Sequence, residues 1–229
     1  MSSPDSESFA DPRWKKPWYD GWFALMATLF TTAFSLRTEG SANVPAQGPV
    51  LLIANHQSFI DPILVGLAAR RHLRYLARKT LFRNPAFTWF IESLNALPVN
   101  QEGFARDGLQ SIIDLLKHGQ AVTVFPEGER TLTGQMNPFR PGVHLVLRWA
   151  PCQIVPVGIA GAYAAWPRWR AYPIPAPLFL PPGAGTVAVS IGKPISSTIY
   201  KGMDRVEVLA DLEKRVHDVQ ARAEVLRRR

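Results

Sequence analysis

The sequence of 229 residues contains little that could cross-link a fold or hold a metal ion. It has a single cysteine, Cys152, which excludes an intramolecular disulfide and a cysteine-based metal cluster and agrees with a reducing compartment. Its five histidines show no ligand spacing such as H-E-x-x-H, and neither the P-loop nor the dinucleotide-binding glycine pattern occurs. We therefore expect no metal ion and no cofactor.

Charged residues are also scarce, at 19%, whereas hydrophobic residues make up 47%. This balance predicts a packed core rather than a disordered chain. The net charge of +8 favours a polyanionic partner, either nucleic acid or an anionic lipid surface. The sequence has no basic helix or metal-binding signature of a nucleic-acid reader. Seven Trp and twelve Phe, many beside Lys, Arg or Pro, suit a bilayer interface, so we expect contact with membrane lipids and not with nucleic acid.

The apolar segment near the N-terminus is short for a membrane-spanning helix. Gly21–Leu36 provides sixteen uncharged residues, whereas a spanning helix needs roughly 20. Because Trp, Lys and Arg flank it, we predict an interfacial helical segment over residues 13–40, with an ordinary buried helix as the alternative. The polar residues 1–12 are expected to be disordered, and they lack the basic start and apolar core of a secretory signal.

From Gly48 onwards, short apolar runs alternate with helical patterns. The runs bounded by turn residues predict strands over residues 48–55, 73–79, 97–100, 121–128, 152–161 and 186–192. Helices are predicted over residues 62–70, 84–97, 105–117, 142–150 and 205–229. This alternation predicts an α/β fold, a single domain with a mixed, largely parallel central sheet flanked by helices. The Pro-rich and aromatic stretch 166–182 is expected to be a rigid, extended excursion.

One candidate site is the segment Asn55–Pro62, with the sequence N-H-Q-S-F-I-D-P. It lies where a strand ends and a helix begins, which is the usual place for a site in an open α/β sheet. With His56 on the loop and Asp61 at the helix start, the carboxylate can turn back to meet the imidazole. Such a pair fixes the tautomer that leaves the other ring nitrogen free as a base. The alternative is that Asp61 caps the helix and His56 is an ordinary loop residue.

A second candidate segment is Phe125–Thr131, with the sequence F-P-E-G-E-R-T, after another apolar strand. Gly128 permits a tight turn, and Arg130 offers a planar, bidentate group suited to phosphate. Taken alone, this segment is equally compatible with a surface turn that contains a salt bridge.

Together the two segments resemble the glycerolipid acyltransferases, a family that includes the 1-acylglycerol-3-phosphate acyltransferases. The family's N-H-x-S-x-x-D motif is matched by Asn55, His56, Ser58 and Asp61. Its F-P-E-G-[T/S]-R motif is matched by Phe125, Pro126, Glu127, Gly128 and Arg130. Further matches are the strand lysine Lys79, the V-P-V core at 155–157, and the Phe-x-x-Gly of Phe139 and Gly142. Order and spacing agree from residue 48 to about 160.

Two positions depart from the family's pattern. Gln101 stands where the family's second block often carries Arg, and Glu129 replaces a small hydroxyl residue before Arg130. Both changes subtract positive or neutral character near the expected phosphate site. They leave the chemistry intact, and the identity of the acceptor lipid stays open.

The resemblance implies a membrane-associated O-acyltransferase, with its catalytic domain in residues 41–229, at the cytoplasmic face of the membrane. It would move a fatty acyl group from acyl-CoA or acyl-carrier protein to a lysophospholipid hydroxyl. The default acceptor is 1-acylglycerol-3-phosphate, and another lyso-lipid is the alternative. His56 would be the general base and Asp61 would orient it. The residues expected to bind substrate are Asn55, Ser58, Lys79, Glu127, Gly128 and Arg130, with Arg140 as a weaker phosphate anchor.

Several segments of the sequence are compatible with more than one role. Residues 84–97 and 166–182 could line an acyl-chain channel or simply pack in the core. The basic C-terminal tail could meet an anionic partner or form a solvated helix end. Residues 188–192 (A-V-S-I-G) distantly resemble a hydrolase nucleophile elbow, but they alternate as a plain strand. A non-catalytic, basic lipid-binding protein is the remaining rival to an enzyme.

Overall fold

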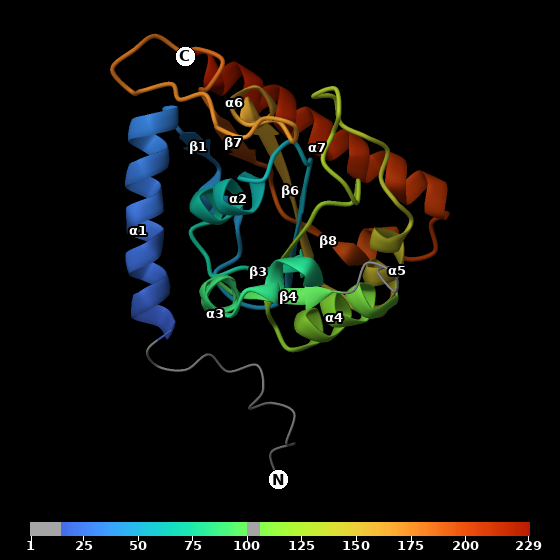
Figure 1. The fold of residues 1–229 in the computed structure, drawn as a ribbon. Helices are drawn as coiled ribbons and strands as arrows, with labels where there is room; N and C mark the ends of the chain where they lie inside the picture. Colours follow the sequence, from blue (N-terminus) through green and yellow to red (C-terminus); the bar gives the residue numbers. More distant parts are fainter. Residues whose placement is uncertain (1–14, 100–105) are drawn as a thin grey trace.

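Strand β2 (Val50–Ala54) lies in the middle of the central sheet and is fully buried. The computed structural model describes residues 15–99 and 106–229. Within them, an eight-stranded sheet has the order β1-β7-β6-β2-β5-β3-β4, and β8 pairs with β6 (Figure 1). The other strands are β1 (Arg37–Glu39), β3 (Arg74–Arg78), β4 (Ala96–Val99), β5 (Ala121–Val124), β6 (Gln153–Ala160), β7 (Ala188–Ile191) and β8 (Ile195–Ser196).

The sheet is mixed and largely parallel, as the sequence predicts. Strands β2, β3, β4, β5 and β6 run parallel to their neighbours in that group. Strand β7 is antiparallel to β6 and parallel to β1, and β8 is antiparallel to β6. A parallel strand covered on both faces reads as a continuous hydrophobic run, which is why V-L-L-I-A was recognisable as a strand.

Helices cover both faces of this sheet. They are α1 (Lys15–Phe34), α2 (Asp61–Ala69), α3 (Pro85–Ser93), α4 (Arg106–Lys117), α5 (Gly142–Trp149), α6 (Ala162–Ala165) and α7 (Arg205–Arg227). Short 3-10 helices are η2 (Ser41–Asn43), η3 (Lys79–Arg83) and η4 (Ser197–Tyr200). Among the described residues, no helix is both long enough and apolar enough to cross a bilayer.

Alternate residues of β2 contribute to two separate hydrophobic cores. Val50 and Leu52 pack with side chains of α1 and α2, whereas Leu51 and Ile53 pack with side chains of α4, α5 and α7. The division follows from the two-residue period of a strand, which sends successive side chains to opposite faces. The result is a three-layer arrangement that leaves the ends of the strands free for a site.

The predicted helical segment over residues 13–40 is helical only as far as Phe34. Ser35 has a left-handed backbone conformation, with φ of 46°, which turns the chain away from the helix axis. Residues Arg37–Glu39 then pair with β7, 151 residues further along the chain. That pairing is non-local, so it has no signature in the segment itself. The predicted disordered residues 1–12 lie outside the described part of the chain.

The stretch 166–182 is an excursion without regular secondary structure; it contains turns rather than being extended throughout, and it lies against the C-terminal end of α1. The Ala176 N–H donates to the Ala33 carbonyl at 2.8 Å, and the Leu178 N–H donates to the Thr32 carbonyl at 3.0 Å. Figure 1 shows this orange loop at the top, beside the end of α1. Strands β1 and β8 and the one-turn helix α6 were not predicted, because such short elements carry too few residues to show a period.

The C-terminal arginines find partners within the chain. Arg222 pairs with Glu39 at 3.0 Å, while Arg227 and Arg228 pair with Glu224 at 2.6 and 2.7 Å. The Arg222 and Arg228 side chains are exposed, and exposed pairs contribute only about 0–1 kcal/mol each. They favour the interpretation of this tail as a solvated helix end.

Candidate active site

The two motif segments meet at one edge of the sheet. His56 follows β2, and the segment that begins at Phe125 follows β5, the parallel neighbour of β2. Strand β6 flanks β2 on the other side and is also parallel to it. The carboxyl ends of parallel strands lie along the same edge, which is where open α/β sheets place their sites.

The His56 imidazole and the Asp61 carboxylate form a hydrogen-bonded pair. His56 Nδ1 lies 2.8 Å from Asp61 Oδ2; the imidazole is partly exposed and the carboxylate is fully buried. The same oxygen accepts the backbone N–H groups of Gln57 at 2.5 Å and Ser58 at 2.7 Å. With three donors on one oxygen, the carboxylate fixes both the loop and the ring.

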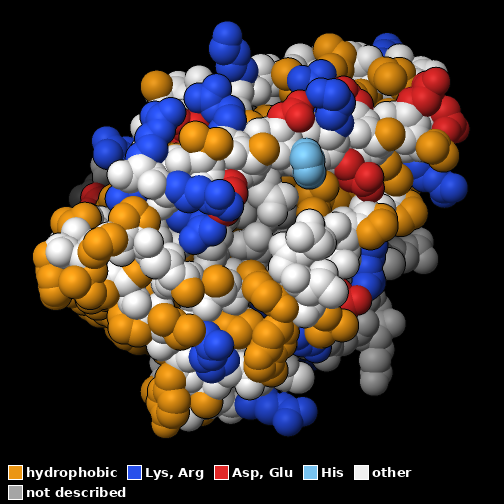
Figure 2. All heavy atoms as spheres, turned by 90° about the horizontal axis from the view of Figure 1, so that it is seen from above, with side chains coloured by type: hydrophobic (Ala, Val, Ile, Leu, Met, Phe, Trp, Pro, Cys, Tyr) orange, Lys and Arg blue, Asp and Glu red, His pale blue; other side chains and the backbone are white. Residues whose placement is uncertain are grey.

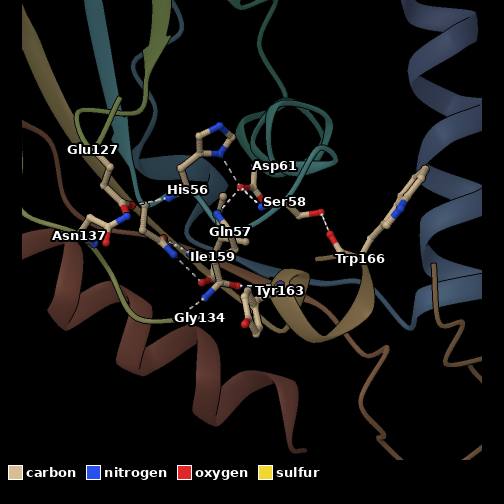
Figure 3. Close-up of polar contacts among 11 residues, drawn as sticks. His56, Gln57, Ser58, Asp61, Glu127, Gly134, Asn137, Ile159, Tyr163 and Trp166 are labelled. Atoms are coloured by element: carbon tan, nitrogen blue, oxygen red, sulfur yellow. Dashed lines mark hydrogen bonds and ion pairs between the residues drawn. The ribbon is translucent and has the colours of Figure 1, made fainter. Parts of the chain in front are cut away.

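The geometry assigns the proton of the imidazole. Because Nδ1 faces a carboxylate oxygen, that nitrogen is the donor, and Nε2 of the neutral ring has a free lone pair. Figure 3 shows the ring turned so that its other nitrogen points away from Asp61. The ring also stacks on Phe125, with centroids 4.2 Å apart and planes at 22°. A ring held in this way can accept a proton at Nε2 from a molecule on its exposed side.

The backbone of His56 is held by the second motif segment. Its N–H donates to Glu127 Oε1 at 2.6 Å, and its carbonyl accepts the Thr131 N–H at 2.9 Å. The other Glu127 oxygen accepts the Asn137 N–H at 2.8 Å. The Glu127 carboxyl therefore ties the loop of His56 to two points of the connection between β5 and α5 (Figure 3).

Glu127 is buried, and its environment changes its acidity. Burial raises the pKa of the Glu127 carboxyl from 4.5 to about 7, although hydrogen bonds from Asn137 and His56 act in the opposite direction. Both carboxyl oxygens already accept N–H groups. The predicted contact of Glu127 with substrate stays a prediction, and the role visible in the structure is to position His56.

Asn55 and Ser58 also form hydrogen bonds within the protein. Asn55 is buried, donates to the Ile159 carbonyl at 3.0 Å and accepts the Ile159 N–H at 2.7 Å, which ties the loop to β6. The Ser58 hydroxyl donates to the Trp166 carbonyl at 2.6 Å. Their predicted contact with substrate is untested, and these bonds show that they hold the loop of His56 in place.

The cationic side chains of the site come from several segments. The Arg130 guanidinium carbon lies 3.4 Å from the centroid of the Phe59 ring, a cation–π contact. Arg140 donates from Nε to the Glu127 carbonyl at 3.0 Å and lies against Gly128, where a side chain would clash with it. The left-handed φ of 76° at Gly128 likewise favours glycine. Arg140 is therefore better integrated into the motif turn than its sequence position indicated.

Glu129 lies between two arginines. Its carboxylate oxygens are 3.5 Å from Arg140 Nη2 and 3.8 Å from Arg168 Nη1. All three side chains are partly or largely exposed. This departure from the family motif thus places a negative charge among cations that could otherwise meet an anionic group of a substrate.

The remaining predicted residues are less closely tied to His56. Lys79 is exposed and begins η3 directly after β3, one residue beyond the strand on which it was expected. Gln101 lies outside the described residues. Ser190 is buried in β7, and its hydroxyl donates to Glu39 at 2.7 Å, so it does not form a nucleophile elbow.

Sequence reasoning missed several residues that support the site. The buried Gln57 side chain accepts the Tyr163 N–H at 3.3 Å and lies 3.5 Å from the Gly134 carbonyl. Thr131 and Asn137 act through backbone N–H groups. Backbone donors have no residue-type signature, and the bonds of Gln57 and Thr131 join segments far apart in sequence. No motif search could have found them.

Comparisons with known proteins identify the family of this chain. A family profile described as Acyltransferase matches residues 35–160, more than half of the chain. The 1-acyl-sn-glycerol-3-phosphate acyltransferase of Bacillus subtilis is 28% identical over 120 residues, covering 52% of this chain and 59% of that protein. The chloroplastic enzyme of the same name from Arabidopsis thaliana is 28% identical over 131 residues, covering 56% of this chain and 36% of that protein.

The fold is shared with a solved structure. The crystal structure of the 1-acyl-sn-glycerophosphate acyltransferase of Thermotoga maritima superposes with a TM-score of 0.75 at 24% identity, covering 96% of this chain and 85% of that one. The aligned part covers 36% of the length of the Arabidopsis thaliana protein and 59% of that of the Bacillus subtilis protein. Because the family profile matches more than half of this chain, the protein belongs to the acyltransferase family.

Proposed function

We propose that this protein is a membrane-associated O-acyltransferase. It transfers a fatty acyl group from acyl-CoA or acyl-carrier protein to the free hydroxyl of 1-acylglycerol-3-phosphate, giving phosphatidic acid. The observation that carries the proposal is the His56–Asp61 pair at 2.8 Å, with the other ring nitrogen turned away from the carboxylate and the imidazole partly exposed (Figure 3). The printed names of the relatives support the choice of acceptor.

In the proposed reaction, His56 Nε2 takes the proton of the acceptor hydroxyl as its oxygen attacks the thioester carbonyl. The new C–O bond forms and a tetrahedral intermediate results. Its collapse breaks the C–S bond, and the departing thiolate takes the proton from the imidazolium. Asp61 stabilises that imidazolium through Nδ1. No acyl-enzyme, metal ion or cofactor is needed, because the thioester is a substrate.

The cations near the motif turn are suited to the phosphate of the acceptor. Arg130 and Arg140 lie on the segment that holds His56, and a guanidinium can bind phosphate through two parallel hydrogen bonds. Lys79 follows the neighbouring strand at the same sheet edge and is a further candidate. These groups would hold the headgroup while the acyl chain extends towards lipid.

A different lyso-lipid is the second candidate acceptor. The observation that favours it is Glu129, which lies within 4 Å of two arginines. A carboxylate there competes with a phosphate monoester and favours a headgroup with less negative charge or with an amine. The reaction at His56 would be the same.

The test is thiol release from acyl-CoA and, separately, from acyl-carrier protein, with a panel of detergent-dispersed lyso-lipids. The His56→Ala variant should lose about 10²–10⁴-fold in rate, the contribution of a general base. The matched control is His217→Ala, because His217 is an exposed histidine on α7. Circular dichroism of both variants checks that they fold.

Each outcome has a defined meaning. Release that needs lysophosphatidic acid and fails only in His56→Ala supports the proposal. Release with another lyso-lipid alone keeps the mechanism and changes the acceptor. Release without any acceptor would indicate a thioesterase, and no release from folded protein would favour a non-catalytic lipid-binding role.

A further inference from the structure

The outer face of α1 carries no charge over its last three turns. One side of the helix packs on the core through side chains such as Phe30 and Phe34. The opposite side exposes Leu25 and Leu29, at 53% and 45%. A helix whose water-facing side lacks charged residues is unusual for a soluble protein, where that side is normally polar.

The polar side chains on this face satisfy their hydroxyl groups internally. Thr28 donates to the Ala24 carbonyl at 3.0 Å, and Thr32 donates to the Thr28 carbonyl at 2.8 Å. A hydroxyl bonded within its own helix needs no water partner, which is the condition for contact with hydrocarbon. The threonines on the outer face of α1 therefore present mainly their methyl groups beside the leucines.

A second exposed apolar element lies beside this face. Leu178, Phe179 and Leu180 form the tip of the excursion and are 56%, 84% and 53% exposed. Three hydrogen bonds link the excursion to the C-terminal end of α1: the two backbone bonds described above and one from the buried Ser35 hydroxyl to the Ala176 carbonyl at 2.7 Å. The tip therefore sits at a fixed place next to α1.

The excursion itself carries basic but no acidic residues, and Glu129 of the motif turn lies 3.8 Å from its Arg168. Residues 161–192 contain no Asp or Glu, and the excursion carries the exposed Arg168 and Arg170 together with the exposed aromatic residues Trp169 and Tyr172. Figure 2 shows hydrophobic side chains gathered on the left, the side of α1 in Figure 1, with Lys and Arg side chains near them. Exposed leucine and aromatic side chains bordered by arginine match an anionic bilayer surface.

We propose that the outer face of α1 and the Leu178–Leu180 tip together form one membrane-docking surface, whose occupant is an anionic lipid bilayer. This inference rests on the proposed membrane-associated function and names the surface that performs it. Because the inner side of α1 is packed on the core, the helix lies along the interface and the tip enters as a wedge.

The docking surface is connected to the candidate active site. The Trp166 carbonyl at the base of the excursion accepts the Ser58 hydroxyl, and the Trp166 ring lies 6.2 Å from that of Phe59. Phe59 in turn contacts Arg130. A lipid acceptor that leaves the bilayer along the excursion would meet an aromatic and then a cationic side chain before it reached His56.

The test measures binding to vesicles made of equal parts of phosphatidylcholine and phosphatidylglycerol by flotation. The full-length Phe179→Asp variant, and a variant with Leu178, Phe179 and Leu180 all changed to Ser, should bind about 10–100-fold more weakly, as expected when a large apolar side chain no longer enters lipid. The control is Val206→Asp, because Val206 is 65% exposed at the start of α7. It should bind like the wild type.

A second measurement tests the depth of the tip directly. A polarity-sensitive fluorophore is attached to Phe179→Cys or, as the control, to Val206→Cys. The native Cys152 is buried, so it stays unlabelled in the folded protein. Addition of vesicles should brighten the label at 179 and leave the label at 206 unchanged.

The outcomes separate this inference from the proposed reaction. Weaker vesicle binding by the tip variants, with full activity on a detergent-dispersed acceptor, supports the docking surface. Unchanged vesicle binding and an unresponsive label at 179 overturn it, whatever the catalytic activity. Loss of a self-associated species in the tip variants without loss of vesicle binding also overturns it, and assigns the surface to a second copy of the chain.

Discussion

The role of Asp61 can be divided into geometry and charge by two substitutions. In Asp61→Asn, an amide oxygen can take the place of Oδ2 and keep its three hydrogen bonds, from His56 Nδ1, Gln57 N and Ser58 N. The loop and the imidazole tautomer are then retained while the negative charge is lost. In Asp61→Ala, the three hydrogen bonds and the negative charge are lost together.

The expected magnitudes differ for stability and for rate. Asp61→Ala leaves the N–H groups of Gln57 and Ser58, both buried residues, without their acceptor, at about 1–3 kcal/mol each. Its free energy of unfolding should fall by roughly 2–6 kcal/mol. Asp61→Asn should stay within about 1–2 kcal/mol of the wild type, yet lose most of the ~10²–10⁴-fold supplied by the base, because the imidazolium has no carboxylate partner.

The assay pairs urea unfolding with initial rates of thiol release from the acyl donor. An Asp61→Asn variant that is stable and slow supports the reasoning. A stable variant with wild-type rate would refute it, because the carboxylate charge would then be irrelevant to the reaction. A variant as unstable as Asp61→Ala would refute the claim that one oxygen organises the loop.

Three further predictions concern residues around the site and the core. Burial raises the pKa of Glu127 from 4.5 to about 7. The stability that Glu127 adds, measured by urea unfolding against Glu127→Gln, should therefore be complete below pH 4.5 and fall by roughly 3 kcal/mol as the pH rises from 4.5 through about 7. A difference in stability that does not change with pH would contradict this. Glu129→Ser should lower KM for lysophosphatidic acid up to about fivefold, the size of an exposed charge interaction, with no change for a zwitterionic lyso-lipid; equal KM values would remove Glu129 from acceptor choice. Gly158→Ala should destabilise by about 1–3 kcal/mol or more in thermal unfolding, since the new Cβ would lie 2.1 Å from a backbone nitrogen of α7; Gly21→Ala, with no atom within 4 Å, is the control and should be neutral or slightly stabilising.

The fold was largely predictable because its main elements have strong local patterns. The buried strands β2 and β6 read as unbroken apolar runs, and α7 begins at a capping box of Asp204 and Glu207. The strand β1 was not predictable, because three residues pair with a strand that lies far along the chain. Its existence depends on a partner and not on its own composition.

The sequence by itself determined the family and the α/β class, and it predicted the His56–Asp61 pair, because motif residues and strand patterns are local properties. It also identified Glu127 and Ser58 as site residues, but not their tasks. Only the tertiary structure decided that Glu127 holds the backbone of His56 and that Ser58 anchors the excursion at Trp166. Only it placed the 178–180 tip against α1. Hydrogen bonds between segments 70 to 150 residues apart depend on how the strands are ordered in the sheet, and no single segment of the sequence encodes that order.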